Sequence, residues 1–140
     1  MSIWKTEMSA EALQTLCKNT LVEHLGIQIT EVGDDYVCAS MPVDNRTHQP
    51  MGLLHGGASV VLAETLGSVA AQLATESGQH CVGLEINANH LSSIRTGHVY
   101  GKASPIHIGR STQVWDIRIV DENEKAICAS RLTMAVLEKN

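Results

Sequence analysis

A long stretch with almost no formal charge, from Met51 to Thr75, constrains the fold of this chain more than any other feature. It is built mainly from Gly, Ala, Ser, Val and Leu, and its one formally charged residue is Glu64. Apolar residues recur at helical spacing from Ala58 to Thr75, which predicts a helix. Because this helix offers water almost no charge, we expect the rest of the protein to enclose it on most sides.

The same stretch is long enough to be considered as a membrane span. However, Glu64 and Gln72 lie inside it, charged groups are costly in lipid, and strand-like segments follow directly. We therefore predict a buried helix and no membrane contact. The N-terminus has no basic start followed by an apolar run, so it predicts no secretion signal, and the expected location is the cytoplasm.

Length and composition predict one globular domain over residues 1–140. The chain is 44% apolar and 18% charged, and no linker or repeat divides it. A net charge of −5, the lack of a basic block and the scarcity of aromatic residues argue against a nucleic-acid partner. Four cysteines without a paired motif predict free thiols and no metal site.

A short helix and a hairpin are expected before the long helix. We predict an amphipathic helix from Ser9 to Asn19, capped by its first residue and with Leu13 and Leu16 on its apolar side. Apolar residues on either side of a turn at Gly33–Asp35 then indicate a β-hairpin. The polar run from Asp44 to Gly52 predicts a loop that leads into the long helix.

Extended segments follow the long helix and indicate an antiparallel sheet. From Cys81 to His90, apolar residues alternate with polar ones, which predicts one buried and one exposed face of a strand. The apolar residues of this alternation are Val82, Leu84, Ile86 and Ala88. Further strands are expected over 98–109, 111–120 and 126–137. Since strands and helices do not alternate, we predict an α+β fold in which a curved sheet wraps around one long helix.

Two glycines stand where the long helix should begin. The first amides of a helix lack partners within it and carry the positive end of its dipole. Without side chains, Gly56 and Gly57 would let a carbonyl approach these N–H groups, which is the chemistry of an oxyanion hole. The alternative is that the pair serves only a tight turn.

The lone carboxylate, Glu64, is the second candidate. A buried carboxylate needs hydrogen-bond donors, and Ser68 lies four residues further on the same helical face. The alternatives are that Glu64 faces solvent or a subunit boundary, or pairs with an arginine of the sheet, and that Ser68 is a small packing residue. Gly56 and Glu64 are separated by about 12 Å of helical rise. They can therefore act on one carbonyl only if two chains pair around a two-fold axis.

Three motifs resemble a known family. They are "QPMGLLHGGASVVLAETLGS" (49–68), "VGLEINANHLSS" (82–93) and "PIHIGRSTQVW" (105–115). Together they resemble the hotdog-fold acyl-CoA thioesterases of the 4-hydroxybenzoyl-CoA thioesterase family, Arthrobacter-type branch, over nearly the whole chain. The resemblance implies a sheet wrapped around one helix, with homodimers that join their sheets and pair into homotetramers.

The resemblance also implies roles for individual residues. Glu64 matches the catalytic carboxylate, Gly56 the oxyanion amide, and Ser68 the hydroxyl partner of the carboxylate. Gln49 and His55 match polar groups beside the thioester carbonyl. The residues that match segments lining the acyl and CoA site are Gly83, His90, Leu91, Ser92, Ser93, His107, Ile108, Gly109, Arg110, Ser111 and Thr112.

The implied reaction is hydrolysis of an aromatic acyl-CoA, of the hydroxybenzoyl or 1,4-dihydroxy-2-naphthoyl type, with menaquinone biosynthesis as its setting. CoA would be part of the substrate, and no cofactor or metal is expected. Glu64 would act either as the nucleophile or as a general base. An acyl or aryl carrier protein in place of CoA is the alternative substrate, and hence a second expected partner.

Two other classes of protein remain open at this stage. A hotdog dehydratase or hydratase would use His55 as a base, and a non-catalytic module would only bind the acyl-CoA. A plain hydrogen bond to the loop is the alternative for His55. Arg95, Lys102 and Arg110 are candidates for CoA phosphates, and solvated surface charge is the alternative for each.

Overall fold

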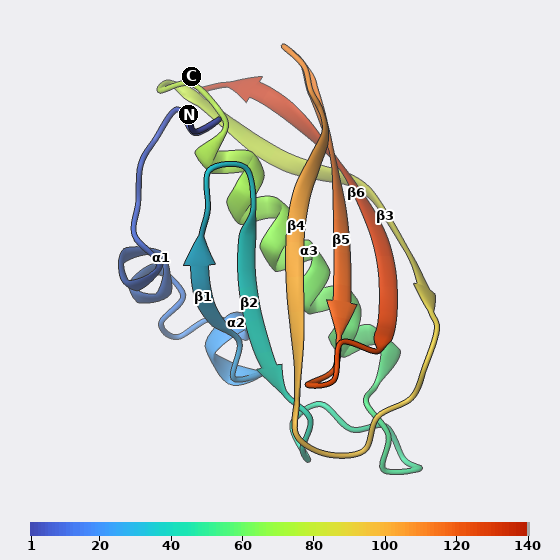
Figure 1. Cartoon of the computed structure of the whole chain (residues 1–140). Coiled ribbons are helices and arrows are strands. Elements are labelled where there is room, and N and C mark those ends of the chain that lie inside the picture. The colour runs from blue at the N-terminus through green and yellow to red at the C-terminus, as the bar shows by residue number, and fades with distance from the viewer. Residues whose placement is uncertain (140) are drawn as a thin grey trace.

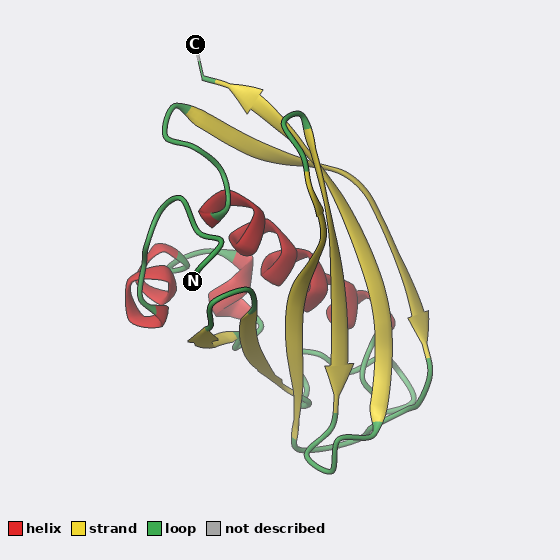
Figure 2. Ribbon diagram, turned by 45° about the horizontal axis from the view of Figure 1, so that its top comes forward, coloured by secondary structure: helices red, strands yellow, loops and turns green. Residues whose placement is uncertain are grey.

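The computed structural model describes residues 1–139 and has one six-stranded antiparallel sheet in the order β1-β2-β4-β5-β6-β3. Figure 2 shows the helices on one side of the sheet, with the long helix along its concave face. The predicted α+β architecture is therefore confirmed. The elements in Figure 1 are α1 (Ala10–Leu16), α2 (Leu21–His24), β1 (Gln28–Val32), β2 (Val37–Pro42), α3 (Gly56–Leu73), β3 (Gln79–His90), β4 (His98–Ile108), β5 (Thr112–Val120) and β6 (Ala126–Glu138).

Helix α3 packs closely on the sheet through one face. Leu62, Leu66 and Ala70 are fully buried on that face. Gly67 lies against β6, where an added Cβ would stand 2.5 Å from a methyl carbon of Leu132, so a glycine is needed for this close approach. On its other face α3 is covered only in part by the short helix α2, and Val61 and Val69 are half-buried there. The predicted enclosure on most sides is thus confirmed, because only Gly57, Glu64 and Gln72 of α3 are exposed.

The N-terminal helix is confirmed with one correction. Ser9 caps α1, and its side chain accepts a hydrogen bond from the backbone N–H of Ala12 at 3.1 Å. Leu13 is buried, but Leu16 is 68% exposed, so its predicted place on the apolar side is wrong. The helix ends at Leu16, and Asn19, the predicted last residue, has a φ of 61° that lies outside the helical conformation.

The predicted inward face of β3 is wrong in its first half. A β-bulge interrupts the pairing of β3 with β6 between Gly83 and Glu85. Such an extra residue reverses the faces to which the following side chains point. As a result Ile86 packs against the core as predicted, whereas Val82 is 40% and Leu84 is 60% exposed.

A buried chain of hydrogen bonds ties β5 to the end of α3. The indole Nε1 of Trp115 donates to Oε1 of Gln113 at 2.9 Å, and Nε2 of Gln113 donates to Oγ1 of Thr75 at 3.1 Å. Thr75 in turn donates to the carbonyl of Ala71 at 2.6 Å. All three side chains are thereby satisfied inside the core.

In the part of the chain that the structure describes, no helix combines the length and apolarity required to cross a membrane.

Candidate active site

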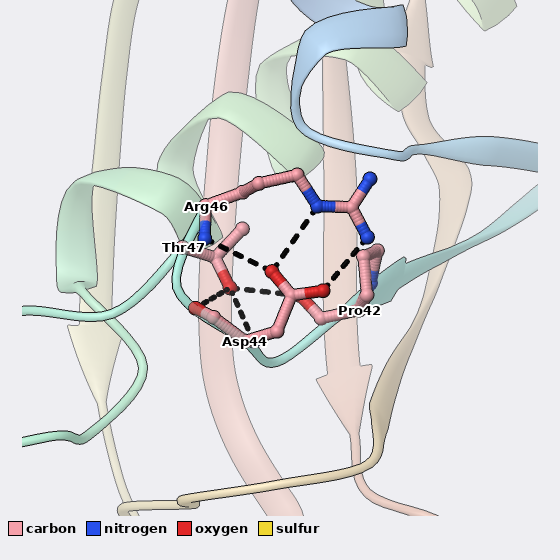
Figure 3. A network of polar contacts seen from close by, with 4 residues as sticks. All are labelled: Pro42, Asp44, Arg46 and Thr47. Atoms are coloured by element: carbon pink, nitrogen blue, oxygen red, sulfur yellow. Dashed lines mark hydrogen bonds and ion pairs between the residues drawn. The ribbon is translucent and has the colours of Figure 1, made fainter.

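The loop between β2 and α3 starts with a compact polar turn (Figure 3). Thr47 is buried, and its hydroxyl donates to the carbonyl of Pro42 at 2.8 Å and accepts from the backbone N–H of Asp44 at 3.2 Å. The guanidinium of Arg46 pairs with the carboxylate of Asp44 at 2.7 Å. Hydrogen bonds from the side chain and backbone of Arg46 hold the pKa of Asp44 below its ordinary value.

The second half of the loop holds Gln49 and His55 in place. The backbone N–H of Gln49 donates to the carbonyl of Leu53, and that of His55 donates to the carbonyl of Thr47, both at 2.8 Å. The side-chain Oε1 of Gln49 accepts the N–H of Met51. A backbone N–H can only donate, so this contact fixes the amide orientation. It leaves Nε2 of Gln49 as a donor that no residue among 1–139 uses.

His55 is the N-cap of α3. Its ring Nδ1 accepts from the N–H of Gly57 at 2.8 Å, and its carbonyl accepts from Ala58 at 3.0 Å and from Ser59 at 3.3 Å. His55 thus makes a local hydrogen bond, to the first turn of the helix rather than to the loop. The N–H of Gly56 is the one amide of this first turn that has no acceptor in the described chain. It stands at the positive end of the dipole of an 18-residue helix.

A depression of about 400 Å³ opens at the start of α3, and we call it the amide pocket. His90 packs its ring against Gly56, where an added Cβ would lie 2.8 Å from Nε2 of the ring. A side chain at this position would therefore require the His90 ring to shift. Of the residues predicted from the sequence, the structure gathers Gln49, Gly56 and 90–93 around this space. Its lining residues are Gln49, Leu53, Leu54, Gly56, Ser59, His90, Leu91, Ser92, Ser93 and Ile127.

Glu64 lies in a second depression, of about 380 Å³, between α2 and α3, which we call the carboxylate pocket. One carboxylate oxygen of Glu64 lies 3.1 Å from the point where a Cβ on Gly83 would stand, so Gly83 leaves room for it. Within residues 1–139 Glu64 forms no ion pair, and the alternative of an arginine partner is wrong. The lining residues are Cys17, Leu21, Val22, Val61, Glu64, Thr65, Ser68 and Val69.

Ser68 does not make the expected hydrogen bond to Glu64 in the single chain. Its hydroxyl instead lies 4.0 Å from the sulfur of Met134 on β6. Ser68 and Glu64 share the wall of the carboxylate pocket, as their spacing predicted, without touching through their polar atoms. Burial raises the pKa of the Cys17 thiol, so this wall of the pocket stays uncharged and mostly apolar.

The hairpin between β4 and β5 lies at the opposite end of α3 from the amide pocket. Ile108, Gly109 and Arg110 line a depression of about 280 Å³ together with Thr75, which follows the helix. Since α3 is about 27 Å long by its helical rise, the residues 107–112 cannot reach the Gly56 amide of their own chain. Of the segment, His107 and Ser111 are exposed and Thr112 begins β5.

The three cationic candidates for CoA phosphates have different surroundings. Arg95 donates to the carbonyl of Met51 at 3.2 Å, beside the loop that holds Gln49. Lys102 stands over the ring of Tyr36, with its Nζ 4.3 Å from the centroid. Arg110 is exposed on the β4–β5 hairpin.

Throughout residues 1–139, no three His, Cys, Asp or Glu side chains are placed to hold a metal ion.

Ser59 is the pocket residue that sequence reasoning missed. It is only 1% exposed and lines the amide pocket, three residues after Gly56 on the same helical face. That spacing puts it on the face of Gly56, but only the structure shows that it lines the pocket. Thus one chain carries amide donors in one depression and a carboxylate in another. The two can act on a single bond only when two chains meet, as the rise along the helix predicted.

Comparisons with known proteins agree with these features. A family model described as the thioesterase superfamily matches residues 51–128. The chain is 55% identical to proofreading thioesterase EntH of Cronobacter turicensis over 135 residues. The matched region covers 96% of this chain and 98% of the relative. It is also 54% identical to 1,4-dihydroxy-2-naphthoyl-CoA hydrolase of Escherichia coli over 135 residues, which are 96% of this chain and 99% of the relative. A solved thioesterase structure from Haemophilus influenzae has a TM-score of 0.95 at 52% identity, with 97% and 95% covered.

Proposed function

Because the chain belongs to the thioesterase superfamily, whose hotdog fold and thioester-hydrolysing activity it shares, we propose that its substrate is an aromatic acyl-CoA. The products would be the free acid and CoA, and CoA enters as part of the substrate rather than as a cofactor. The name of the Escherichia coli relative, a hydrolase of 1,4-dihydroxy-2-naphthoyl-CoA, supports an aromatic acyl group. The corresponding setting is menaquinone biosynthesis in the cytoplasm.

The carboxylate pocket supports this choice of acyl group. It is lined mainly by apolar side chains, among them Leu21, Val61 and Val69, and its volume is about 380 Å³. Pockets of this size and lining suit flat hydrophobic ligands. An aromatic ring seated there would bring its carboxyl carbon next to Glu64, where the thioester bond must be broken.

In the proposed mechanism Glu64 of one chain attacks the thioester carbonyl or activates the water that does. The developing oxyanion is bound by the Gly56 N–H of a second chain, with Nε2 of Gln49 from that chain as a further donor. The observation that carries this proposal is the free Gly56 amide at the positive end of α3. Thiolate is a good leaving group, so no strong general acid is required.

Strand β3 supports the pairing of two chains that this mechanism needs. It is the last strand of the sheet, 12 residues long, and its outer edge has no partner strand in the described chain. A long free edge is a ready template for a second strand. Antiparallel pairing of two β3 edges would lay the two α3 helices side by side in opposite directions. We propose this homodimer, with a homotetramer built from two of them.

A panel of thioesters tests the function. We expect release of free CoA from 1,4-dihydroxy-2-naphthoyl-CoA and benzoyl-CoA, followed with a thiol reagent, and a loss of kcat of about 100-fold or more in Glu64→Ala and Glu64→Asp. Near-normal turnover by Glu64→Ala would overturn the mechanism. One turnover in ¹⁸O-labelled water would place label in Glu64 if it is the nucleophile.

A carrier-protein thioester is the second candidate substrate, favoured by the name of the proofreading thioesterase EntH. An aryl carrier protein loaded with the same acyl group belongs in the panel, and a higher kcat/KM on it than on the CoA thioester would establish this alternative. Release of thiol also separates hydrolysis from the two other classes. A hydratase would add water to a double bond of the acyl chain without freeing CoA, and a binding module would leave the thioester unchanged.

A further inference from the structure

Ser59 lies in the wall of the amide pocket, and its hydroxyl has no hydrogen-bond partner in the described chain. Ser59 is 1% exposed. Its backbone N–H is used by the carbonyl of His55, while its hydroxyl makes no hydrogen bond with any residue of the described chain. A hydroxyl at the wall of a pocket, with no partner in the protein, is satisfied by a water or by a ligand. Since Ser59 lines the amide pocket, that partner must come from the pocket.

Helix geometry relates Ser59 to the Gly56 amide. The two residues are three apart on one face of α3, which corresponds to about 4.5 Å of rise. Side chains of a helix also lean toward its N-terminus. Both groups therefore face the same pocket, with the hydroxyl nearly one turn further along the helix than the amide.

The rest of the pocket near Ser59 is mainly hydrocarbon. Leu53, Leu54, Leu91 and Ile127 all contribute to its wall. A ligand that fits this wall has an apolar segment and a single polar group opposite Ser59. The thiol arm of CoA and of carrier proteins has this pattern, because two methylenes separate its sulfur from its first amide. An extended arm therefore places that amide about one helical turn from the thioester carbonyl.

We propose that Ser59 is a substrate-binding residue that hydrogen-bonds the first amide of the pantetheine arm while the Gly56 N–H holds the thioester carbonyl. A hydroxyl both donates and accepts, so it can pair with either the N–H or the C=O of that amide. The inference rests on the proposed function, since it needs the carbonyl at Gly56. It makes Ser59 the group by which the pocket distinguishes a pantetheine thioester from a simple alkyl thioester.

A comparison of two substrates on two enzymes tests this role. The substrates are the benzoyl thioester of N-acetylcysteamine, which carries the amide, and S-pentyl thiobenzoate, which has the same chain length without it. For Ser59→Ala we expect kcat/KM to fall about tenfold on the first and to stay within about twofold on the second. Ser59→Cys keeps the side-chain size and should show the same selectivity. Ser77→Ala, at an exposed serine, is the matched control.

The outcomes separate this inference from the mechanism on which it rests. An equal loss on both substrates would mean that Ser59 acts through packing, and no loss on either would mean that its hydroxyl does not touch the arm. Either result overturns the inference. The melting temperature of Ser59→Ala should not fall, because the hydroxyl has no partner in the protein. Failure of the proposed mechanism would instead appear as normal turnover by Glu64→Ala, which the Ser59 comparison does not involve.

Discussion

At the start of α3, neighbouring polar groups have separate tasks. The imidazole of His55 satisfies the N–H of Gly57, and the carbonyl of His55 satisfies the next two amides. This leaves the Gly56 N–H free for a ligand. A helix usually satisfies its first amides with a Ser, Thr, Asp or Asn cap. A histidine in this position brings a second ring nitrogen, Nε2, which remains available beside the pocket.

The two tasks of His55 can be separated by substitution. Asparagine is a good cap, so His55→Asn should keep the stability of the protein, whereas His55→Ala should lower the free energy of unfolding by about 1 kcal/mol. If the imidazole also orients the thioester, both variants should lose kcat by about tenfold or more. Denaturant unfolding and steady-state kinetics measure the two effects. Full activity in His55→Asn would show that the ring serves the cap alone.

At the scale of elements, the sequence predicted what neighbouring residues decide and missed what depends on distant strands. Gln49, His55 and Gly56 lie on one short loop and helix start, so their proximity follows from the chain itself. The exposure of Val82 could not be predicted, because the bulge in β3 exists only relative to its pairing with β6. The apolar alternation carries no signal of such a register shift.

The site shows the same division. The motif around 107–112 resembles segments that line the acyl and CoA site, yet the structure places it beyond the far end of α3. No spacing in one sequence reports which surface a second chain will bring to it. Conversely, Ser59 looked like another small residue of a buried helix. Its proposed role rests on its position in the wall of the amide pocket, which only the structure reveals.

The β1–β2 hairpin gives a pH-dependent prediction. The hydroxyl of Tyr36 donates to the carboxylate of Glu31 at 2.6 Å, and this hydrogen bond is the main reason that the pKa of Tyr36 is raised to about 12. A raised pKa means that the folded state holds the proton more tightly than the unfolded state. The resulting stabilisation is complete below pH 10, near the ordinary tyrosine pKa, and is lost as the pH rises toward 12.

We therefore expect Tyr36→Phe to melt below the wild-type protein at pH 8 and to approach it as the pH rises above 10. Ultraviolet titration of a Tyr100→Phe background, in which Tyr36 is the remaining tyrosine, should give a midpoint near 12. Glu31→Gln should lower that midpoint, because it removes the carboxylate. An unchanged midpoint in Glu31→Gln would contradict the assignment.

For the whole molecule, the proposed mechanism needs two chains. The amide pocket and the carboxylate pocket lie on different parts of α3. The edge strand β3 borders both, because His90 lines the first and Gly83 lies beside Glu64. Two chains joined along β3 would cross their helices midway between Gly56 and Glu64. Symmetry then creates two equal sites, each with an amide pocket from one chain and a carboxylate from the other.

Mixing two variants, each of which lacks one half of the proposed site, tests this sharing directly. Glu64→Ala removes the carboxylate, and Gln49→Ala removes the free amide donor of the opposite half. In a mixed dimer the Gln49→Ala chain supplies an intact Glu64 to the intact amide pocket of the other chain, while the second site carries both defects. Random pairing makes about half of the dimers mixed, and each has one good site of two, so co-refolded chains should recover about a quarter of wild-type activity.

The alternative arrangement gives a different result. If each site lay within one chain, every site in the mixture would carry one defect, and activity would not exceed the mean of the two parents. Co-refolding each variant with itself controls for losses during refolding. Co-refolding with wild type gives the scale of activity. Recovery well above the parents thus requires that Glu64 and Gln49 come to each thioester from different subunits, and its absence would rule out the two-chain site.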